Sequence, residues 1–362
     1  MPNRLAIVLT VVLTAAAAVS PGAEPAPAQT PATPPTAPEF RRDVLLDRGW
    51  TIKLPLGFRP SAAHIPQDNG MSDQKAALGK LLYYDTRLSK DSAVSCGTCH
   101  NPFHGFAGPD RIPRGAAGKT ARRNAPTILN RLFSTRQGWD GRAGVIEDQV
   151  RTHLTDEMAM ESEEAVVRRV REIPGYVPLF KRANGVDTID ADRIVKALAA
   201  YGRTVLSGDS AYDRYVAGEP TALGPAAIRG LEVFTGKGHC VACHSGVNFT
   251  DESYRNTGVG VNRRPPDLGR AEVTNDAADR GKFKVPTLRN VALTAPYMHD
   301  GSIDSLAAVV EYYNGGGTAN PGLAKEIQPL RLSDAEKTGL IALLESLTGT
   351  MRNSSPPVTF PN

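Results

Sequence analysis

The chain has 362 residues, which is enough for about two domains of ordinary size. Hydrophobic residues make up 41% of it and charged residues 22%, a composition that excludes a collagen-like, a fully disordered or a polytopic membrane chain. The 42 lysines and arginines against 38 aspartates and glutamates leave a net charge of +4, too small to indicate a basic stripe for nucleic acid.

The N-terminal segment has the pattern of an export signal. The run Leu5–Val19 is almost entirely apolar, follows Arg4, and gives way to a segment rich in small residues and proline. We therefore expect residues 1–24 to be a signal peptide, residues 25–40 to be a Pro-rich linker, and the mature protein to be periplasmic. An uncleaved anchor is the alternative, but the run is shorter than the about 20 residues that a spanning helix needs.

Five helices are predicted from apolar residues that recur at helical spacing. They are, with their apolar faces, Lys75–Tyr84 (Leu78, Leu81, Leu82), Asp190–Ser207 (Ile194, Leu198, Tyr201, Val205), a helix from Pro225 to Gly236 (Ile228, Leu231, Phe234), a helix that ends at Asn314-Gly315 (Leu306, Val309, Tyr313), and a helix that Ser333-Asp-Ala-Glu336 opens as a capping box (Leu340, Leu344, Leu347). No run of alternating apolar and polar residues indicates a large sheet.

All four cysteines fall in two copies of one motif. These are Cys96-Gly-Thr-Cys99-His100 and Cys240-Val-Ala-Cys243-His244. The pattern C-x-x-C-H is the attachment signature of c-type haem, in which both thiols bond to the porphyrin and the histidine binds the iron. A redox C-x-x-C needs no following histidine, and a zinc site would need ligands that converge from both pairs. We therefore expect two covalently bound haem c groups.

The separation of the two motifs leaves room for a domain around each haem. We expect an N-terminal haem domain over residues 41–215, a C-terminal haem domain over residues 216–350, and a tail over residues 351–362. The predicted fold is mainly α, with two cytochrome-c-like haem domains, long loops and little β structure.

Five further motifs follow one another along the chain. They are Leu78-Gly-Lys-Leu-Leu-Tyr-Tyr-Asp-Thr-Arg-Leu-Ser89, Arg123-Asn-Ala-Pro-Thr127, Trp139-Asp-Gly-Arg142, Phe283-Lys-Val-Pro-Thr-Leu-Arg-Asn290 and Thr294-Ala-Pro-Tyr-Met-His-Asp-Gly301. In this order they resemble the bacterial di-haem cytochrome c peroxidase family, and its MauG-like branch in particular. The resemblance implies that the first haem is the peroxide site and that electrons enter at the second.

The resemblance also implies how the first iron is ligated at rest. The peroxidases of the family carry a ligating histidine in the loop between the first C-x-x-C-H and Arg123. Here that loop reads Arg114-Gly-Ala-Ala-Gly-Lys119, and His104 follows the proximal His100 too closely to reach the opposite side. The first haem is therefore expected to be five-coordinate and open to peroxide without prior reduction.

The distal ligand of the second haem is a second departure. The family's peroxidases use a methionine, and the corresponding position here is Tyr313, as in the MauG-like branch. A phenolate favours higher oxidation states of iron and lowers its potential, whereas methionine raises it. Met298 as the ligand and a core role for Tyr313 are the alternatives.

Three catalytic residues follow from matching the family position by position. Glu157 matches the acid–base glutamate, Gln149 its distal companion, and Trp139 the indole between the two haems. Peroxide cleavage needs such an acid–base group because a proton must pass from the near oxygen to the departing one. A helix-stabilising acid near Ser162 is the alternative for Glu157, and core packing is the alternative for Trp139.

A calcium ion and several partners are implied as well. Asn124 and the carbonyls of Thr294 and Pro296 match an inter-haem site whose oxygen ligands suit Ca²⁺, although Asn124 could instead cap a turn. The expected partners are hydrogen peroxide and either a small periplasmic electron donor, a cytochrome c or a cupredoxin, or a protein substrate. Homodimers are common in the family. We expect neither a nucleic-acid partner nor a membrane span in the mature form.

Three functions remain open at this point. The first is a periplasmic peroxidase that reduces hydrogen peroxide at the open N-terminal haem with electrons passed through the C-terminal haem. The second is a MauG-like enzyme that stores two oxidising equivalents across both haems and oxidises side chains of a partner protein. The third is a non-catalytic di-haem electron carrier, which an open iron disfavours. Tyr313 favours the second function, whereas Gly238 stands where MauG has a further tryptophan.

Overall fold

Helices dominate the part of the chain that the computed structural model describes, residues 43–47 and 49–362. The predicted signal peptide and linker lie outside the described residues. Among the described residues, no helix has both the length and the apolar character needed to span a membrane. The α-helices are α1 (Asp73–Tyr84), α2 (Cys96–Cys99), α3 (Ile146–Thr155), α4 (Glu163–Arg171), α5 (Tyr176–Asn184), α6 (Ala191–Thr204), α7 (Ala211–Val216), α8 (Pro225–Thr235), α9 (Ala271–Thr274), α10 (Leu306–Asn314) and α11 (Asp334–Ser346).

Strands in the described residues are short and occur as three antiparallel pairs. They are β1 (Asp43–Asp47) with β2 (Trp50–Lys53), β3 (Ser207–Gly208) with β6 (Thr350–Met351), and β4 (Tyr254–Arg255) with β5 (Phe283–Lys284). The β3–β6 pair places Ser207 opposite Met351 and so joins distant parts of the sequence. The predicted mainly α fold is confirmed.

All five helices predicted from spacing are present, and local sequence explains their ends. In α1 the Ser72 hydroxyl accepts a hydrogen bond from the Lys75 N–H and so caps the first turn. Helix α8 starts at a proline and stops before Gly236. Helix α11 has the predicted capping box, in which the Ser333 hydroxyl and the Glu336 carboxylate bond each other's backbone N–H.

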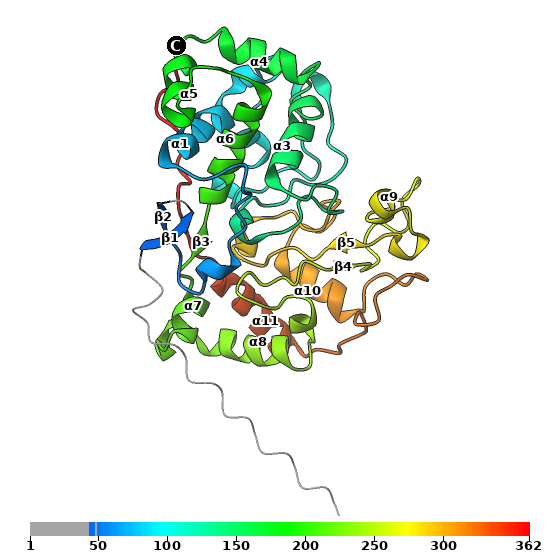
Figure 1. Cartoon of the computed structure of the whole chain (residues 1–362). Helices are drawn as coiled ribbons and strands as arrows, with labels where there is room; N and C mark the ends of the chain where they lie inside the picture. The colour runs from blue at the N-terminus through cyan, green and yellow to red at the C-terminus, as the bar shows by residue number, and fades with distance from the viewer. Residues whose placement is uncertain (1–42, 48) are drawn as a thin grey trace, which may run out of the picture. The chain divides into compact units, whose positions relative to one another are not determined.

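The first hydrophobic core surrounds α6, which is buried on nearly every side. Helix α1 crosses it at Gly79, where a β-carbon would lie 1.8 Å from the Ala197 carbonyl oxygen. Figure 1 shows α1, α5 and α6 together near the top of the molecule. A glycine is therefore required here because the two helix backbones touch.

The second core lies between α8 and α11, near the bottom of Figure 1. These helices also cross through glycines, since a β-carbon on Gly230 would lie 1.9 Å from the Gly339 carbonyl oxygen. Leu343 and Leu347 are fully buried in this core. Ile228 and Leu231, which the spacing predicts to face inward, are only half-buried, whereas Ala227 and Val233 on the same helix are buried.

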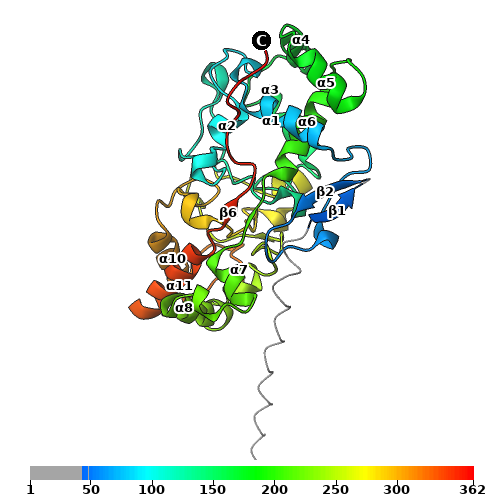
Figure 2. The same cartoon turned by 90° about the vertical axis from the view of Figure 1, so that its left-hand side faces the viewer.

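The C-terminal tail runs back along the N-terminal helices, as Figure 2 shows for the segment that follows β6. The Arg87 guanidinium donates to the Pro361 carbonyl at 2.9 Å, and the Gly175 N–H donates to the Asn362 carbonyl at 2.7 Å. The described residues form one compact unit. The division into haem domains near residue 215 stays a prediction.

Candidate active site

Both C-x-x-C-H motifs form tight helical turns that present their histidines in the same way. The first is α2, and the second is a 3₁₀ turn at Cys240–Ala242. His100 Nδ1 lies 2.9 Å from the Pro126 carbonyl oxygen, and His244 Nδ1 lies 3.0 Å from the Phe249 carbonyl oxygen. Because a carbonyl can only accept, Nδ1 carries the proton in each ring and Nε2 is left to bind a metal.

The four thiols are half-buried and protonated at neutral pH. Burial, and then the neighbouring Cys99, raises the pKa of the Cys96 thiol to about 12. Burial also raises the pKa of Cys99 and of Cys240 to about 11. Neutral thiols beside a metal-binding imidazole fit c-type haem.

A cavity of about 280 Å³ opens beside the second motif. It is largely apolar, and its lining side chains come from both halves of the chain. Those that bear on the predictions are Trp139, His244, Phe283, Met298, His299 and Tyr313. The cavity therefore brings the proximal His244 together with both candidate distal ligands.

Tyr313 and Met298 approach this cavity from different elements. Tyr313 lies on α10, where Leu306, Val309 and Val310 line the same cavity, which agrees with the predicted face of that helix. Met298 lies in a turn and has a positive φ of 75°. Burial, and then Tyr312, raises the pKa of Tyr313, so its phenol stays protonated unless a cation stabilises the phenolate.

A hydrogen-bonded chain of three side chains lies at the end of α3. The Gln149 side-chain nitrogen is 2.8 Å from His153 Nε2, and His153 Nδ1 is 2.5 Å from a Glu157 carboxylate oxygen. The His153 ring also contacts the ring of His100, with centroids 6.2 Å apart. Two of the predicted catalytic residues are therefore joined through a third, next to the first C-x-x-C-H motif.

Glu157 is held by its backbone as well as by its side chain. The Ala116 N–H donates to the Glu157 carbonyl at 2.8 Å, and a β-carbon on Gly115 would lie 2.3 Å from that carbonyl oxygen. The histidine-free loop Arg114–Lys119 thus packs directly on Glu157. Burial would raise the pKa of Glu157, but the hydrogen bond that His153 donates to its carboxylate outweighs burial and lowers the pKa below its usual value. The first turn of α4 uses Glu163 and Glu164 instead, so Glu157 does not act as its first-turn acid.

His153 is the site residue that sequence reasoning missed. A usable signal was present, because Gln149 and His153 are four residues apart and so share one face of a helix. Glu157 could not be added by spacing, since α3 ends at Thr155 and the chain then turns. Only the structure brings all three together.

Trp139 connects the surroundings of the two motifs. Its indole N–H donates to the Asn124 carbonyl at 2.8 Å, and its ring lines the cavity with His299 at a centroid distance of 6.5 Å. The preceding Gly138 faces Gln149, whose side-chain oxygen lies 3.2 Å from where a β-carbon would be. Trp139 is therefore anchored to the loop network and is not simply packed in a core.

The predicted calcium ligands meet at one wall of the same cavity, which Asn124, Thr294 and Pro296 all line. The Asn124 amide donates to the carbonyls of Asp110 and Arg111 at 3.1 and 3.3 Å. It therefore also bridges a turn, which is the alternative role considered for this residue. Among the described residues, no group of three or more His, Cys, Asp or Glu side chains could hold a metal ion. A calcium site here would use amide and carbonyl oxygens.

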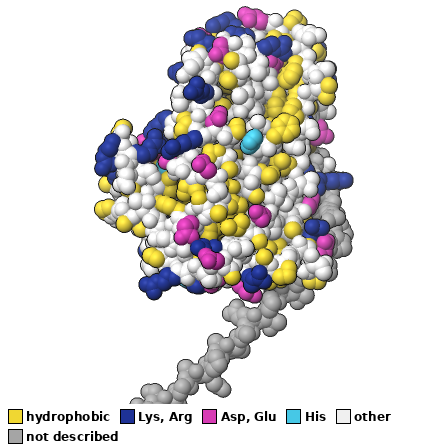
Figure 3. All heavy atoms as spheres, turned by 180° about the vertical axis from the view of Figure 1, so that it is seen from behind, with side chains coloured by type: hydrophobic (Ala, Val, Ile, Leu, Met, Phe, Trp, Pro, Cys, Tyr) yellow, Lys and Arg dark blue, Asp and Glu magenta, His cyan; other side chains and the backbone are white. Residues whose placement is uncertain are grey.

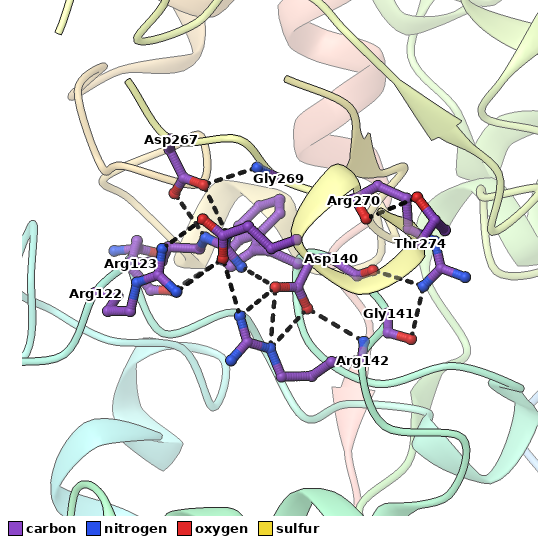
Figure 4. Close-up of polar contacts among 12 residues, drawn as sticks. Arg122, Arg123, Asp140, Gly141, Arg142, Asp267, Gly269, Arg270 and Thr274 are labelled. Atoms are coloured by element: carbon purple, nitrogen blue, oxygen red, sulfur yellow. Dashed lines mark hydrogen bonds and ion pairs between the residues drawn. The ribbon is translucent and has the colours of Figure 1, made fainter. Parts of the chain in front are cut away.

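A cluster of ion pairs, largely buried at Arg123 and Asp140 and exposed at Arg122 and Arg142, fixes the loops that carry these residues (Figure 4). Arg123 makes two hydrogen bonds to Asp267, at 2.7 and 2.8 Å, and one to Asp140 at 2.5 Å. Arg142 also binds Asp140, and Arg122 binds Glu272 through both of its terminal nitrogens. Asp140 directly follows Trp139, so the cluster holds the indole in place.

The surface in Figure 3 has no single charge character. Acidic and basic side chains alternate over most of this face, and hydrophobic side chains gather near its middle. Basic side chains concentrate on the projecting segment around α9, where Arg263, Arg264 and Arg280 are exposed. This face agrees with the small net charge of the sequence.

Comparisons with known proteins find relatives that match most of the chain. A family model described as di-haem cytochrome c peroxidase matches residues 73–221. The methylamine utilization protein MauG of Methylorubrum extorquens is 41% identical over 296 residues, which are 80% of this chain and 82% of that protein. Cytochrome c551 peroxidase of Nitrosomonas europaea is 34% identical over 310 residues, 84% of this chain and 88% of that protein. The crystal structure of a MauG-like protein associated with microbial copper homeostasis has a TM-score of 0.77 and 32% identity, and the match covers 83% and 96% of the two chains.

Proposed function

Because the chain belongs to the di-haem cytochrome c peroxidase family, we propose that it is a periplasmic peroxidase that reduces hydrogen peroxide to water. The reaction consumes one peroxide, two electrons and two protons and yields two water molecules. A small periplasmic cytochrome c or cupredoxin is the proposed electron donor. Electrons enter at the second haem and peroxide reacts at the first.

The two C-x-x-C-H motifs supply what each haem needs. Cys96 and Cys99 would hold the first haem covalently, and Cys240 and Cys243 the second. The hydrogen bonds from the Nδ1 atoms of His100 and His244 to backbone carbonyls support both histidines as proximal ligands. When bound, haem supplies the iron that breaks the O–O bond and stores the oxidising equivalents.

The Gln149–His153–Glu157 chain is the observation that carries the proposal. Glu157 is a carboxylate at neutral pH, so it can take the proton from the peroxide oxygen nearer the iron and return it to the departing oxygen. Within the described residues, the buried side-chain oxygen of Gln149 has no hydrogen-bond partner and could accept from a bound peroxide. Both groups are hydrogen-bonded to His153, and the His153 ring contacts the ring of the proximal His100.

Trp139 and the calcium ligands would connect the two centres. The anchored indole lines the cavity of the second haem and follows the glycine that faces Gln149. A Ca²⁺ ion held by Asn124, Thr294 and Pro296 would stiffen the same wall.

A second candidate function is MauG-like oxidation of side chains on a partner protein. The observation that favours it is Tyr313, which lines the cavity with His244 and offers an oxygen ligand. An oxygen ligand stabilises the oxidised iron and would let the second haem share the oxidising equivalents.

Turnover with an electron donor separates the two candidates. The holoprotein is mixed with hydrogen peroxide and a reduced cytochrome c, and oxidation of the donor is followed optically. Sustained turnover supports the peroxidase. Negligible turnover, together with a long-lived oxidised state of both haems, would contradict it and favour the MauG-like function.

A further inference from the structure

We propose that His153 is a positioning residue on the distal side of the first haem, and that Gln149 and Glu157 keep its ring from binding the iron. The proposal rests on the proposed function only in taking His100 as the proximal ligand. It concerns a residue outside the matched family motifs.

The separation of the two rings supports the distal placement. The His100 and His153 centroids are 6.2 Å apart and their planes are inclined by 63°. Metal–imidazole bonds are about 2.0–2.1 Å long, so two imidazoles that bind one ion from opposite sides have centroids roughly 6 to 6.5 Å apart. The two rings are therefore spaced as they would be if an iron bound to His100 lay between them.

The hydrogen bonds of His153 explain why it would not bind that iron. An amide nitrogen can only donate, so the Gln149 side chain donates to His153 Nε2. This leaves the proton on Nδ1, which donates to the Glu157 carboxylate at 2.5 Å. Both ring nitrogens are thus engaged, and the ring can reach the iron only by giving up one of these bonds.

The hydrogen bond from His153 also positions the Glu157 carboxylate. The backbone of Glu157 is held by the Ala116 N–H, and its carboxylate is held by His153. His153 itself is fixed to α3, whose next residue Leu154 is buried in the first core. The carboxylate is thereby tied to a rigid helix although Glu157 lies beyond its end.

Releasing His153 tests the arrangement directly. The diferric holoprotein carrying Gln149→Leu and Glu157→Leu is compared with wild type by electron paramagnetic resonance. We expect the high-spin signal of the first haem to give way to a low-spin signal of bis-imidazole type, and the high-spin signal to return when His153→Ala is added. A double variant that stays fully high-spin would overturn the proposal, as would a low-spin signal that survives His153→Ala.

A second measurement does not depend on the double variant. Carbon monoxide is bound to the reduced holoprotein, and its infrared stretch is compared among wild type, His153→Ala and the control His64→Ala, which changes an exposed histidine. We expect a shift only in His153→Ala, because only a distal group faces the bound gas. An unshifted stretch would refute the distal placement while leaving peroxide turnover, and so the proposed function, intact.

Discussion

Glu157 occupies its place through two contacts of different kinds, a backbone bond from the loop Arg114–Lys119 and a side-chain bond from α3. The backbone bond holds the main chain at Glu157, and the side-chain bond orients its carboxylate. The carboxylate is ionised under working conditions, and the two contacts hold it where it can act as a base.

Substitution of Glu157 by glutamine should remove this base while preserving the shape of the site. We expect the rate of the peroxide-induced change in the haem absorption to fall by about 10²–10⁴-fold, the usual contribution of a general acid–base group. Stopped-flow mixing measures the rate, and the haem content of the variant should equal that of wild type. Glu164→Gln, which changes an exposed acid on α4, is the control. A Glu157→Gln variant as fast as wild type would exclude Glu157 as the acid–base group.

Tyr313→Met should raise the reduction potential of the second haem. A thioether favours the reduced iron more than a phenolate does, and Met would extend from the same face of α10 into the cavity. Spectroelectrochemical titration gives the two potentials. Tyr312→Phe serves as the control, since that neighbouring hydroxyl donates to the Thr257 carbonyl. An unchanged potential in Tyr313→Met would point to Met298 as the ligand.

Two close helix crossings hold the secondary structure elements in place. Helices α1 and α6 approach each other so closely that Gly79 leaves no room for a side chain, and α8 and α11 meet in the same way at Gly230. The first C-x-x-C-H turn follows α1, so this crossing also positions His100. The Tyr83 hydroxyl, at the end of α1, donates to the His100 carbonyl at 2.9 Å.

A matched pair of alanine substitutions tests the α1–α6 crossing. Gly79→Ala should lower the free energy of unfolding by about 1–3 kcal/mol or more, because the new methyl group would overlap the Ala197 carbonyl. Gly202→Ala, within α6, should instead raise it by about 0.5–1 kcal/mol, because its nearest neighbour would lie at an ordinary 3.9 Å. Denaturant unfolding of the two holoproteins measures both changes. Equal effects from the two substitutions would contradict the tight crossing.

Five of the eleven α-helices in the described residues could be predicted from sequence because their signals are local. Capping residues and apolar spacing lie within one element, as in α1 and α11. The β3–β6 pair could not be predicted, since two-residue strands carry no periodic pattern. The C-terminal tail was predicted only as a tail, and its bonds to Arg87 and Gly175 depend on tertiary structure.

The site residues likewise divide into those with a local sequence signal and those that only the tertiary structure brings together. The two C-x-x-C-H motifs are contiguous in sequence, and their histidines could be assigned from it directly. The Gln149–His153–Glu157 chain needs the turn after α3, and Arg123 meets Asp267 across 144 positions of sequence. Contacts between residues so far apart in the sequence form only in the packed fold, and no local sequence pattern predicts them.

The ion-pair cluster of Figure 4 joins loops that are far apart in the sequence. Burial would raise the pKa of Asp267, but hydrogen bonds from Arg123 and from the Gly269 N–H outweigh it and lower the pKa to about 2. Because this is below the value of about 3.9 for an unfolded chain, the stabilisation is complete above that pH and is lost as the pH falls toward 2.

Asp267→Asn should therefore flatten the acid dependence of stability. Between pH 4 and pH 2 we expect the wild-type free energy of unfolding to fall by about 2 kcal/mol more than that of the variant. Denaturant titrations at several pH values measure the difference. Asp304→Asn, at an exposed aspartate, should follow wild type. Identical acid profiles for wild type and Asp267→Asn would show that the pair does not lower this pKa.

The electron paramagnetic resonance spectrum of the resting diferric holoprotein reports the ligation of both irons at once. We expect a first haem with no sixth ligand from the protein and a second haem held by His244 and an oxygen of Tyr313. The spectrum should then show one high-spin ferric signal beside one low-spin signal unlike that of a histidine–methionine pair. Two low-spin signals, each with nitrogen or thioether ligation, would contradict this ligation.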